Sequence, residues 1–286
     1  MTRIALFQMT AGIDPAQNAA AIVDAVRQAG GEGAEMLFTP EMSGLLDRDR
    51  KRAAAAIARE DEDRVLAAVR EEAAAQGIWV ALGSLAVALD PAAEGAGAGA
   101  VRGAEAPRWA NRSYLVGPDG AIAARYDKIH MFDVDLASGE SWRESNAYRP
   151  GDRVVTAATP LGRLGLAVCY DLRFPALFDA LGRAGCDAIA IPAAFTVPTG
   201  RAHWHVLQRA RAIEASAFIV AAAQVGRHAD GRLTYGHSLV VDPWGEVLLD
   251  MGGEEAGLGF AEIDPARIAE ARRQVPSLAN RREIRE

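Results

Sequence analysis

The stretch RLGLAVCYDLRFPAL, residues 163–177, passes from an apolar run to a polar cluster at a single cysteine. The run before Cys169 is typical of a buried strand, and Pro175 stands where a helix over residues 174–185 would begin. A side chain at such a strand-to-helix elbow is held at a sheet edge, beside backbone N–H groups that can stabilise an oxyanion. Cys169 is therefore either a nucleophile or a small hydrophobic residue of the core, and its placement alone leaves both interpretations open.

Around this elbow, short β-rich runs alternate with alanine-rich helical stretches through most of the chain, which is typical of an α/β domain. The first helix is predicted over residues 14–31, with Asp14 as its N-cap, and a second over residues 52–76. Turn residues predict hairpins at 112–132 and 237–251. Further strands are expected in the runs 3–10, 78–87, 164–169, 187–192, 218–224 and 258–263.

We expect one domain over residues 1–286, because a chain of this length can bury a sizeable core and single α/β domains of this size are common. Residues 91–108 are rich in glycine and alanine and show no periodicity, so they are expected to form a surface loop rather than a linker. The arginine-rich end, about residues 265–286, is expected to be a solvated tail or a partner-contact extension.

Composition limits the possible function. The chain is 50% hydrophobic and 24% charged, as is ordinary for a globular protein, and its formal net charge of -7 argues against a nucleic-acid partner. No apolar run approaches the ~20 residues of a membrane span, and the N-terminal residues show no signal-peptide pattern. Two cysteines exclude a disulfide framework, so we expect a cytoplasmic protein.

A cysteine nucleophile needs a base, and histidine is the usual one. His203 and His205 lie two positions apart in a predicted helix and do not share a face, so they do not form a zinc pair. His228 and His237 lie near loops without a partnering motif. The sequence thus gives little support to a Cys–His arrangement and predicts no metal site, and Cys186, which has no unusual surroundings, is expected to be structural.

Two charged residues stand in unexpected places. Glu41 follows Pro40 at the end of the apolar run MLFTP, where a turn or helix cap is the alternative to a catalytic role. Lys128 lies in ARYDKIHMF, where strand alternation places it on one face with Tyr126 and His130. The alternative for Lys128 is an exposed strand edge.

The stretches FTPEMS, YDKIHMFD and AVCYDLRFP, in this order, resemble the Glu, Lys and Cys segments of the nitrilase superfamily. The resemblance extends through ESNAYRPGD, AHWHVLQRARAIE, AAAQVGRH, YGHSLVVDPWGEVL and RRQVPSLANRR, and so covers nearly the whole chain. Within the superfamily the chain is most similar to the Nit-type amidases, which include deaminated glutathione amidases and omega-amidases. Asp127, where the family usually has arginine, and His205, where an acidic residue commonly stands, depart from the pattern.

The resemblance implies a four-layer α-β-β-α sandwich that forms a homodimer or a higher homo-oligomer, with the active site at strand ends. It implies Glu41 as general base, Lys128 as oxyanion stabiliser and Cys169 as nucleophile, with no metal and no organic cofactor. The backbone N–H of Tyr170 is expected to share the oxyanion. Glu144, in RESNAYRPGD, is expected as a second acid near the pocket, the alternative being a surface glutamate before a turn.

The function so implied is hydrolysis of a small carboxylate-bearing amide to an acid and ammonia through a thioester. Arg173 is the candidate for binding the substrate carboxylate, and an internal ion pair with Asp171 or another acid is its alternative. Phe195 and Thr199 follow the next predicted strand and are expected to line the pocket, unless Phe195 belongs to the core. A nitrilase with the same triad and a non-catalytic binding module of the same fold remain the alternative functions.

Overall fold

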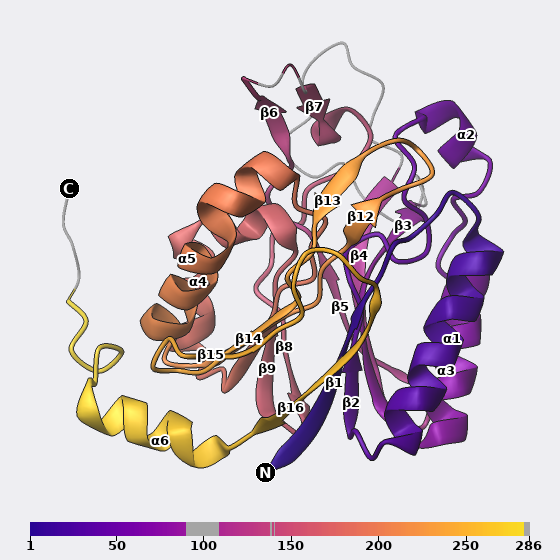
Figure 1. The fold of residues 1–286 in the computed structure, drawn as a ribbon. Helices are drawn as coiled ribbons and strands as arrows, with labels where there is room; N and C mark the ends of the chain where they lie inside the picture. The colour runs from indigo at the N-terminus through magenta and orange to yellow at the C-terminus, as the bar shows by residue number, and fades with distance from the viewer. Residues whose placement is uncertain (90–108, 138, 140, 283–286) are drawn as a thin grey trace.

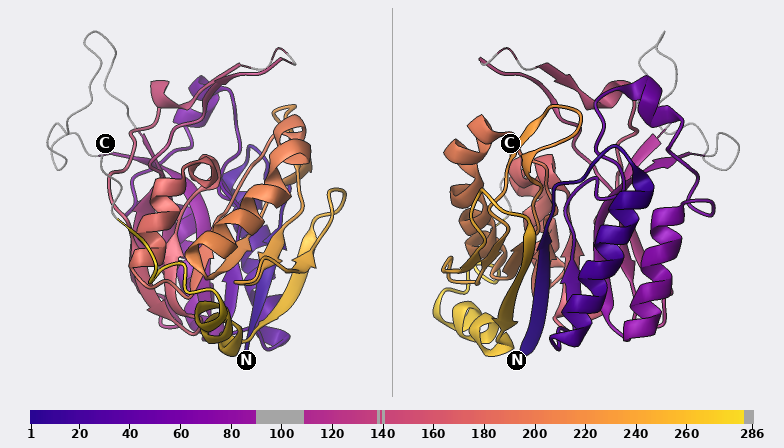
Figure 2. Two further views of the ribbon diagram at one scale, coloured as in Figure 1. Left: turned by 90° about the vertical axis from the view of Figure 1, so that its left-hand side faces the viewer. Right: turned by 45° about the vertical axis from the view of Figure 1, so that its right-hand side comes forward.

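The computed structural model describes residues 1–89, 109–137, 139 and 141–282. In this part of the chain two six-stranded sheets pack face to face, with a layer of helices on the outer side of each (Figure 1; Figure 2). The arrangement is the four-layer α-β-β-α sandwich expected from the sequence.

The first sheet has the order β16-β1-β2-β3-β4-β5, and the second the order β15-β14-β11-β10-β9-β8. The first sheet contains β16 (Gly257–Ile263), β1 (Thr2–Gln8), β2 (Met36–Phe38), β3 (Trp79–Ala88), β4 (Trp109–Val116) and β5 (Ile122–Asp127). The second contains β15 (Val247–Asp250), β14 (Leu239–Val241), β11 (Phe218–Ala221), β10 (Ala188–Ala190), β9 (Gly162–Leu166) and β8 (Thr156–Thr159). Two small hairpins pair β6 (Asp133–Asp135) with β7 (Ser141–Arg143), and β12 (Val225–Arg227) with β13 (Leu233–Tyr235).

The helices divide between the two outer layers. Helices α1 (Pro15–Gly31) and α3 (Arg64–Gln76) cover the first sheet, and α4 (Pro175–Arg183) and α5 (Val197–Ala215) cover the second (Figure 1). The short α2 (Arg50–Ala54) lies above the first sheet, and α6 (Pro265–Gln274) lies at the opposite end, near the N-terminus. Among the helices of the described residues, none is both long enough and apolar enough to cross a membrane.

Strand alternation explains why the first sheet is covered on both faces. Ile4 and Leu6 of β1 lie in the core between the two sheets, whereas Ala5 between them lies in a second core with Ile22 of α1 and Val69 of α3. Side chains of successive strand residues point to opposite faces, so a strand apolar on both faces needs a layer on each side. This pattern places the first sheet between α1 and α3 on one side and the second sheet on the other.

The helix expected over residues 52–76 is wrong as a single element. The chain forms α2 and α3 there, with residues 55–63 between them in turns and irregular structure. The carboxylate of Asp49 caps the start of α2, and that of Asp63 accepts a hydrogen bond of 2.8 Å from the Leu66 N–H at the start of α3. A second N-cap within the alanine-rich run begins a new helix there, because a cap satisfies the free N–H groups of a first turn.

The end of the chain, from α6 onward, packs on the helical layer that covers the second sheet. Arg281 Nε donates to Asp179 Oδ1 in α4 at 2.9 Å, and Arg272 Nη2 donates to the Cys186 carbonyl at 2.6 Å. Cys186 is fully buried in the core, as the sequence predicts. The expected loop at 91–108 and residues 283–286 lie outside the described residues, and the partner-contact role of this end stays a prediction.

Candidate active site

Corresponding positions in the two sheets supply two of the expected site residues. Glu41 is the third residue after β2, and Cys169 is the third residue after β9. Strand β2 is parallel to both of its neighbours, and β9 is parallel to β10 but antiparallel to β8. Lys128 directly follows the antiparallel strand β5. The structure brings Glu41, Lys128, Glu144 and Cys169 together from these separate segments.

The segment carrying Glu41 is held close against β3. Gly83 permits this approach, because a Cβ at this position would lie 2.0 Å from the Thr39 carbonyl oxygen. The Met42 N–H donates to Ser84 Oγ at 2.9 Å, and Met42 itself adopts a positive φ of 56°. A tight turn that is hydrogen-bonded to β3 therefore holds Glu41 in place. The alternative interpretation, that the Glu41 carboxylate caps a turn or a helix, does not hold.

The Glu41 carboxylate is buried and accepts three hydrogen bonds from distant parts of the chain. Oε1 accepts from Lys128 Nζ at 2.9 Å and from Asn111 Nδ2 at 2.9 Å, while Oε2 accepts from the Ala194 N–H at 3.0 Å. Gln224 Nε2 donates to the Glu41 carbonyl at 2.9 Å. Four polar contacts thus hold one carboxylate and its backbone in place.

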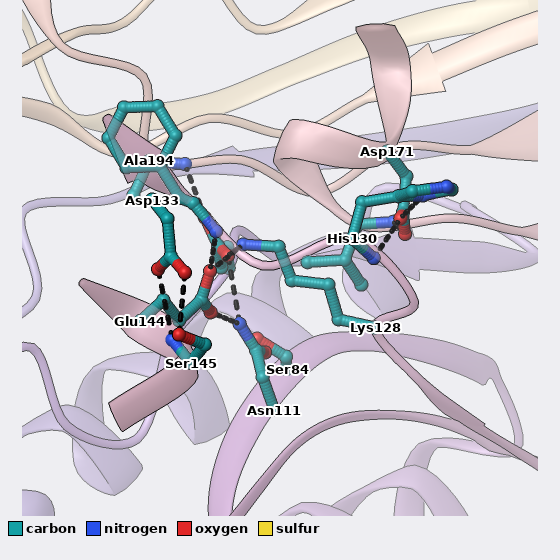
Figure 3. A network of polar contacts seen from close by, with 12 residues as sticks. Ser84, Asn111, Lys128, His130, Asp133, Glu144, Ser145, Asp171 and Ala194 are labelled. Atoms are coloured by element: carbon teal, nitrogen blue, oxygen red, sulfur yellow. Dashed lines mark hydrogen bonds and ion pairs between the residues drawn. The ribbon is translucent and has the colours of Figure 1, made fainter. Parts of the chain in front are cut away.

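Lys128 lies between two carboxylates (Figure 3). Its Nζ is 2.9 Å from Glu41 Oε1 and 2.8 Å from Glu144 Oε2, and its side chain is only 2% exposed. The Phe132 N–H also donates to Glu144 Oε2, at 2.7 Å. The ammonium thus lies buried between the two acids, and the exposed-edge interpretation of Lys128 is wrong.

Burial and charge act in opposite directions on Lys128. Burial lowers the pKa of its ammonium, but the charges of Glu144 and Glu41 outweigh burial and hold this pKa well above its usual value. Lys128 is therefore a permanent cation at neutral pH. With its carboxylate 12% exposed and bonded to Lys128, Glu144 is not the surface glutamate considered as its alternative.

Cys169 begins a 3₁₀ helix, Cys169–Arg173, that leads into α4. Its φ is +47°, a left-handed conformation that is uncommon for a residue with a side chain and that marks the strand-to-helix elbow. The Cys169 N–H donates to the Pro192 carbonyl at 2.9 Å, and the Val168 N–H donates to Asp171 Oδ2 at 2.9 Å. The elbow predicted from the sequence is present and is tied down on both sides of the cysteine.

The thiol of Cys169 is buried beside the charged cluster. Burial raises its pKa well above the usual value, and the negative charge of Glu41 together with a hydrogen bond to that carboxylate raises it further. The ammonium of Lys128 lowers it, but by less. Cys169 therefore rests as a neutral thiol next to a carboxylate that can accept its proton.

Two residues that sequence reasoning did not place in the site hold it together. Asn111, in β4, donates from Nδ2 to Glu41 Oε1 and, at 3.0 Å, to Glu144 Oε1, so it links the two acids. Asp171 is fully buried, and its Oδ1 accepts from the His130 N–H at 2.9 Å and contacts His130 Nδ1 at 2.7 Å (Figure 3). Asp171 was considered only as a partner for Arg173, and nothing in the sequence around Asn111 marks it.

Arg173 does not pair with Asp171 or with any other acid among the described residues. It is half-buried, and its guanidinium lies 5.8 Å from the centre of the Tyr170 ring and 5.4 Å from that of Phe195. Its Nη1 is 3.2 Å from His203 Nδ1. The internal ion pair considered as an alternative is therefore absent from this part of the structure.

Phe195 and Thr199 have different surroundings. Phe195 is buried and packs on Trp204 at 4.8 Å between ring centroids, so it belongs to the core while also facing Arg173. Thr199 is half-buried in the first turn of α5, and its Oγ1 lies 2.8 Å from Thr196 Oγ1. Whether these residues meet substrate stays a prediction.

The two departures from the family pattern lie outside the cluster around Cys169. Asp127 accepts a pair of hydrogen bonds from Arg112, at 2.6 and 3.0 Å. His205 Nε2 lies 3.0 Å from Asp250 Oδ2, and Nδ1 of His237 lies 2.9 Å from Oδ1 of the same carboxylate. His203 and His205 have separate partners, as their spacing predicts.

Comparison with known proteins gives one consistent result. The chain matches the family model of carbon-nitrogen hydrolases over residues 3–273. It is 38% identical over 281 residues to the deaminated glutathione amidase of Yersinia enterocolitica, covering 98% of this chain and 92% of that protein. It is 39% identical over 184 residues to the human omega-amidase NIT2, covering 64% of this chain and 66% of that protein.

A solved structure agrees with these sequence matches. The amidase of Nesterenkonia sp. AN1, determined with acrylamide added at its active site cysteine, has a TM-score of 0.75 and 26% identity, covering 96% of this chain and 98% of that chain. The fold and the family expected from the sequence are confirmed. Because the family model spans nearly all of it, the chain belongs to the carbon-nitrogen hydrolases, the nitrilase superfamily.

Proposed function

We propose that this carbon-nitrogen hydrolase is a cysteine-dependent amidase acting on a small amide that carries a carboxylate. The observation that carries the proposal is the buried Lys128 ammonium, bonded to both Glu41 and Glu144 beside the Cys169 thiol. A base, a nucleophile and a fixed positive charge are the three components that acyl transfer from an amide needs.

In the first half-reaction Cys169 Sγ attacks the amide carbon while its proton passes to Glu41. The carbonyl oxygen becomes an oxyanion held by Lys128 and by the Tyr170 N–H. An ammonium has three N–H donors, and two of those on Lys128 go to Glu41 and Glu144, which leaves one for the oxyanion. The protonated Glu41 then donates its proton to the leaving nitrogen, the C–N bond breaks, and a thioester remains.

In the second half-reaction water replaces the amine. Glu41 accepts a proton from water as its oxygen adds to the thioester carbon, and the same donors hold the second oxyanion. The C–S bond breaks, the acid leaves, and Glu41 returns the proton to Cys169. A primary ω-amide releases ammonia, whereas a substituted amide such as deaminated glutathione releases an amine.

Glu144 acts through Lys128 in this scheme. Its carboxylate holds the ammonium at 2.8 Å, and Asn111 and the Phe132 N–H hold the carboxylate in turn. A fixed ammonium needs no reorganisation when charge develops on the substrate, and this preorganisation is the main source of oxyanion stabilisation. We assign Glu144 to positioning.

Arg173 is the group we assign to the substrate carboxylate. It lies four residues after the nucleophile, with no acid among the described residues to neutralise it. Asp171 is not available to it, because Tyr126, Val168 and His130 already donate to both of its oxygens. An unpaired, half-buried guanidinium beside a reactive centre favours an anionic substrate.

A binding module of the same fold has less support. Burying two carboxylates and an ammonium costs several kcal/mol per ion before their attraction is counted, and apolar side chains of similar size often stabilise a fold as well or better. A scaffold gains nothing from this cluster, whereas acyl transfer requires it.

We also propose a cytoplasmic homodimer formed through the outer face of α5. Val206 and Ile213 are spaced seven residues apart on this helix, and their exposed fractions are 62% and 49%. Trp244, in the turn between β14 and β15, is 55% exposed. Large apolar side chains gathered near one helix are typical of an interface, and both cysteines are free thiols, as suits a reducing compartment.

Product analysis with a small substrate panel tests the proposal. The panel contains deaminated glutathione, a primary ω-amide with a carboxylate, a neutral amide of equal length and a matching nitrile, and the acid products are quantified by chromatography. We expect turnover of the carboxylate-bearing amides by the wild type and none by Cys169→Ala, with Cys186→Ala as the matched control that keeps most activity. Turnover of the nitrile alone would identify a nitrilase, and full activity in Cys169→Ala would refute the mechanism.

A further inference from the structure

His205, His237 and Asp250 meet at the surface beside α5, and their metal-ligating atoms all lie within 4.8 Å of one another. His205 belongs to α5, His237 precedes β14, and Asp250 ends β15. Asp250 Oδ2 is 3.0 Å from His205 Nε2, and Oδ1 is 2.9 Å from His237 Nδ1. Three separate elements thus direct two imidazoles and one carboxylate to a common point.

The backbone holds His237 in this orientation. Its φ is +57°, its N–H donates to the Gly252 carbonyl at 2.7 Å, and its own carbonyl accepts from Trp204 Nε1 at 2.8 Å. The Tyr235 ring stacks on the imidazole at 4.4 Å between centroids. A non-glycine residue persists in this conformation only when its surroundings fix it, and strain of this kind often marks a functional position.

We propose that His205, His237 and Asp250 form a site for one divalent cation of the zinc type, completed by water. Two imidazoles and a carboxylate suit Zn²⁺ and its transition-metal neighbours, whereas Mg²⁺ and Ca²⁺ prefer all-oxygen sites. Ligand bonds of about 2.0–2.2 Å place neighbouring ligand atoms roughly 3.4 Å apart in a tetrahedral site. The contacts of 2.9–3.1 Å from the carboxylate to the two imidazoles are already close to this spacing.

The site is open to solvent, so a cation and its water ligands can enter. The side chains of His205, Asp250 and His237 are 35%, 33% and 24% exposed. Binding needs each neutral imidazole to carry its proton on the ring nitrogen that faces away from the ion. In the competing arrangement each imidazole carries its proton on the nitrogen that faces Asp250, and the carboxylate accepts an N–H from both rings. Metal titration distinguishes the metal-binding arrangement from this hydrogen-bonded one.

A bound ion would fasten α5 to the β14–β15 hairpin. Trp204, adjacent to His205, packs on Phe195 and bonds to the His237 carbonyl, so the tie extends into the core. Because a ligand that binds only the folded chain stabilises it, Zn²⁺ is expected to raise the melting temperature.

The test is a Zn²⁺ titration by calorimetry, paired with Co²⁺ absorption spectra, on the Cys169→Ala chain, because this background removes the thiol of the active site. We expect one ion per chain and no comparable binding of Mg²⁺. His205→Gln and Asp250→Asn should each weaken Zn²⁺ binding at least tenfold, whereas His203→Gln, on the same helix, should leave it unchanged.

Melting curves of each variant without metal verify that the chains are folded. Absence of saturable binding to the folded Cys169→Ala chain would overturn the site. Zn²⁺ affinities of His205→Gln and Asp250→Asn equal to that of the Cys169→Ala parent would overturn it too. So would a loss of affinity in His203→Gln as large as that in His205→Gln. None of these outcomes depends on the amidase activity, so the two proposals fail separately.

Discussion

The hydroxyl of Tyr126 donates a hydrogen bond of 2.7 Å to Oδ2 of Asp171. Tyr126, in β5 of the first sheet, stands two residues before Lys128. Asp171, in the 3₁₀ helix that follows β9 of the second sheet, stands two residues after Cys169. Burial raises the pKa of Tyr126 well above its usual value, and the charge of Asp171 adds to this, so the phenol stays a donor at every working pH. One buried bond thus couples the position of the ammonium to that of the thiol.

Removing this bond should disturb both stability and catalysis. Tyr126→Phe leaves Asp171 with one donor fewer in a fully buried place, which typically costs about 1–3 kcal/mol of unfolding free energy. Because the elbow loosens, kcat is expected to fall more than KM rises. Urea unfolding and steady-state kinetics on the same preparation check this, and a variant with wild-type stability and wild-type kcat would show that the bond is dispensable.

Loss of the buried cation should affect the chemical step most strongly. Lys128→Met removes an oxyanion donor, for which a decrease in kcat of roughly a hundredfold or more is typical. It also leaves Glu41 and Glu144 without the charge between them. Rates measured alongside melting curves separate the two effects, and an unchanged kcat in a folded variant would remove Lys128 from the mechanism.

The resting thiol should become more acidic when its neighbouring charge is removed. Burial and the Glu41 carboxylate both raise the pKa of Cys169, whereas Lys128 lowers it, so Glu41→Gln removes a raising influence and keeps the lowering one. The thiolate should then form at lower pH although turnover is lost. Thiolate absorbance against pH, with Cys169→Ala subtracted, measures the shift.

Cys186 does not interfere with this titration at moderate pH, because burial raises its pKa to about 11. A thiol pKa in Glu41→Gln that is equal to or higher than that of the wild type would contradict the coupling between the two groups.

Arg173 should determine which amides are substrates. Arg173→Met is expected to raise KM for carboxylate-bearing amides by about tenfold or more and to leave a neutral amide of similar size little affected. Since Arg173 pairs with no acid in the part of the chain that the structure describes, the melting temperature should change little. Arg183→Met, in α4, whose guanidinium pairs with Asp179, is the matched control. Equal losses on charged and neutral substrates in the Arg173 variant would refute the assignment.

Local patterns in the sequence predicted the parts of the fold that local physics determines. Asp14 caps α1, its carboxylate accepting from the Ala16 N–H at 2.9 Å, and both expected hairpins form, because turn residues and caps act over a few positions. The break between α2 and α3 was missed because alanine and charged residues favour a helix throughout, and only the caps divide it.

The site was predictable where a chemical residue type stands at a strand end and the family resemblance gives it a role, as for Glu41, Lys128 and Cys169. Asn111 escaped notice because an asparagine inside a strand has no local signature, and its partners lie 70 and 33 positions away. The His205, His237 and Asp250 group was missed for the same reason: spacing along a helix tests only neighbours on that helix, and these three residues meet through tertiary packing.

The cluster around Cys169 straddles the seam between the two sheets. Glu41 and Lys128 leave the first sheet, while Cys169 and Ala194 leave the second, and the Ala194 N–H donates to Glu41 across that seam. Neither half of the chain contains the machinery by itself. The Ala194–Glu41 contact spans 153 positions in sequence, so we expect it to form late relative to helices and hairpins. Catalytic competence therefore reports that the two halves have docked in register, because the thiol of Cys169 has its base only when the seam between the sheets is closed.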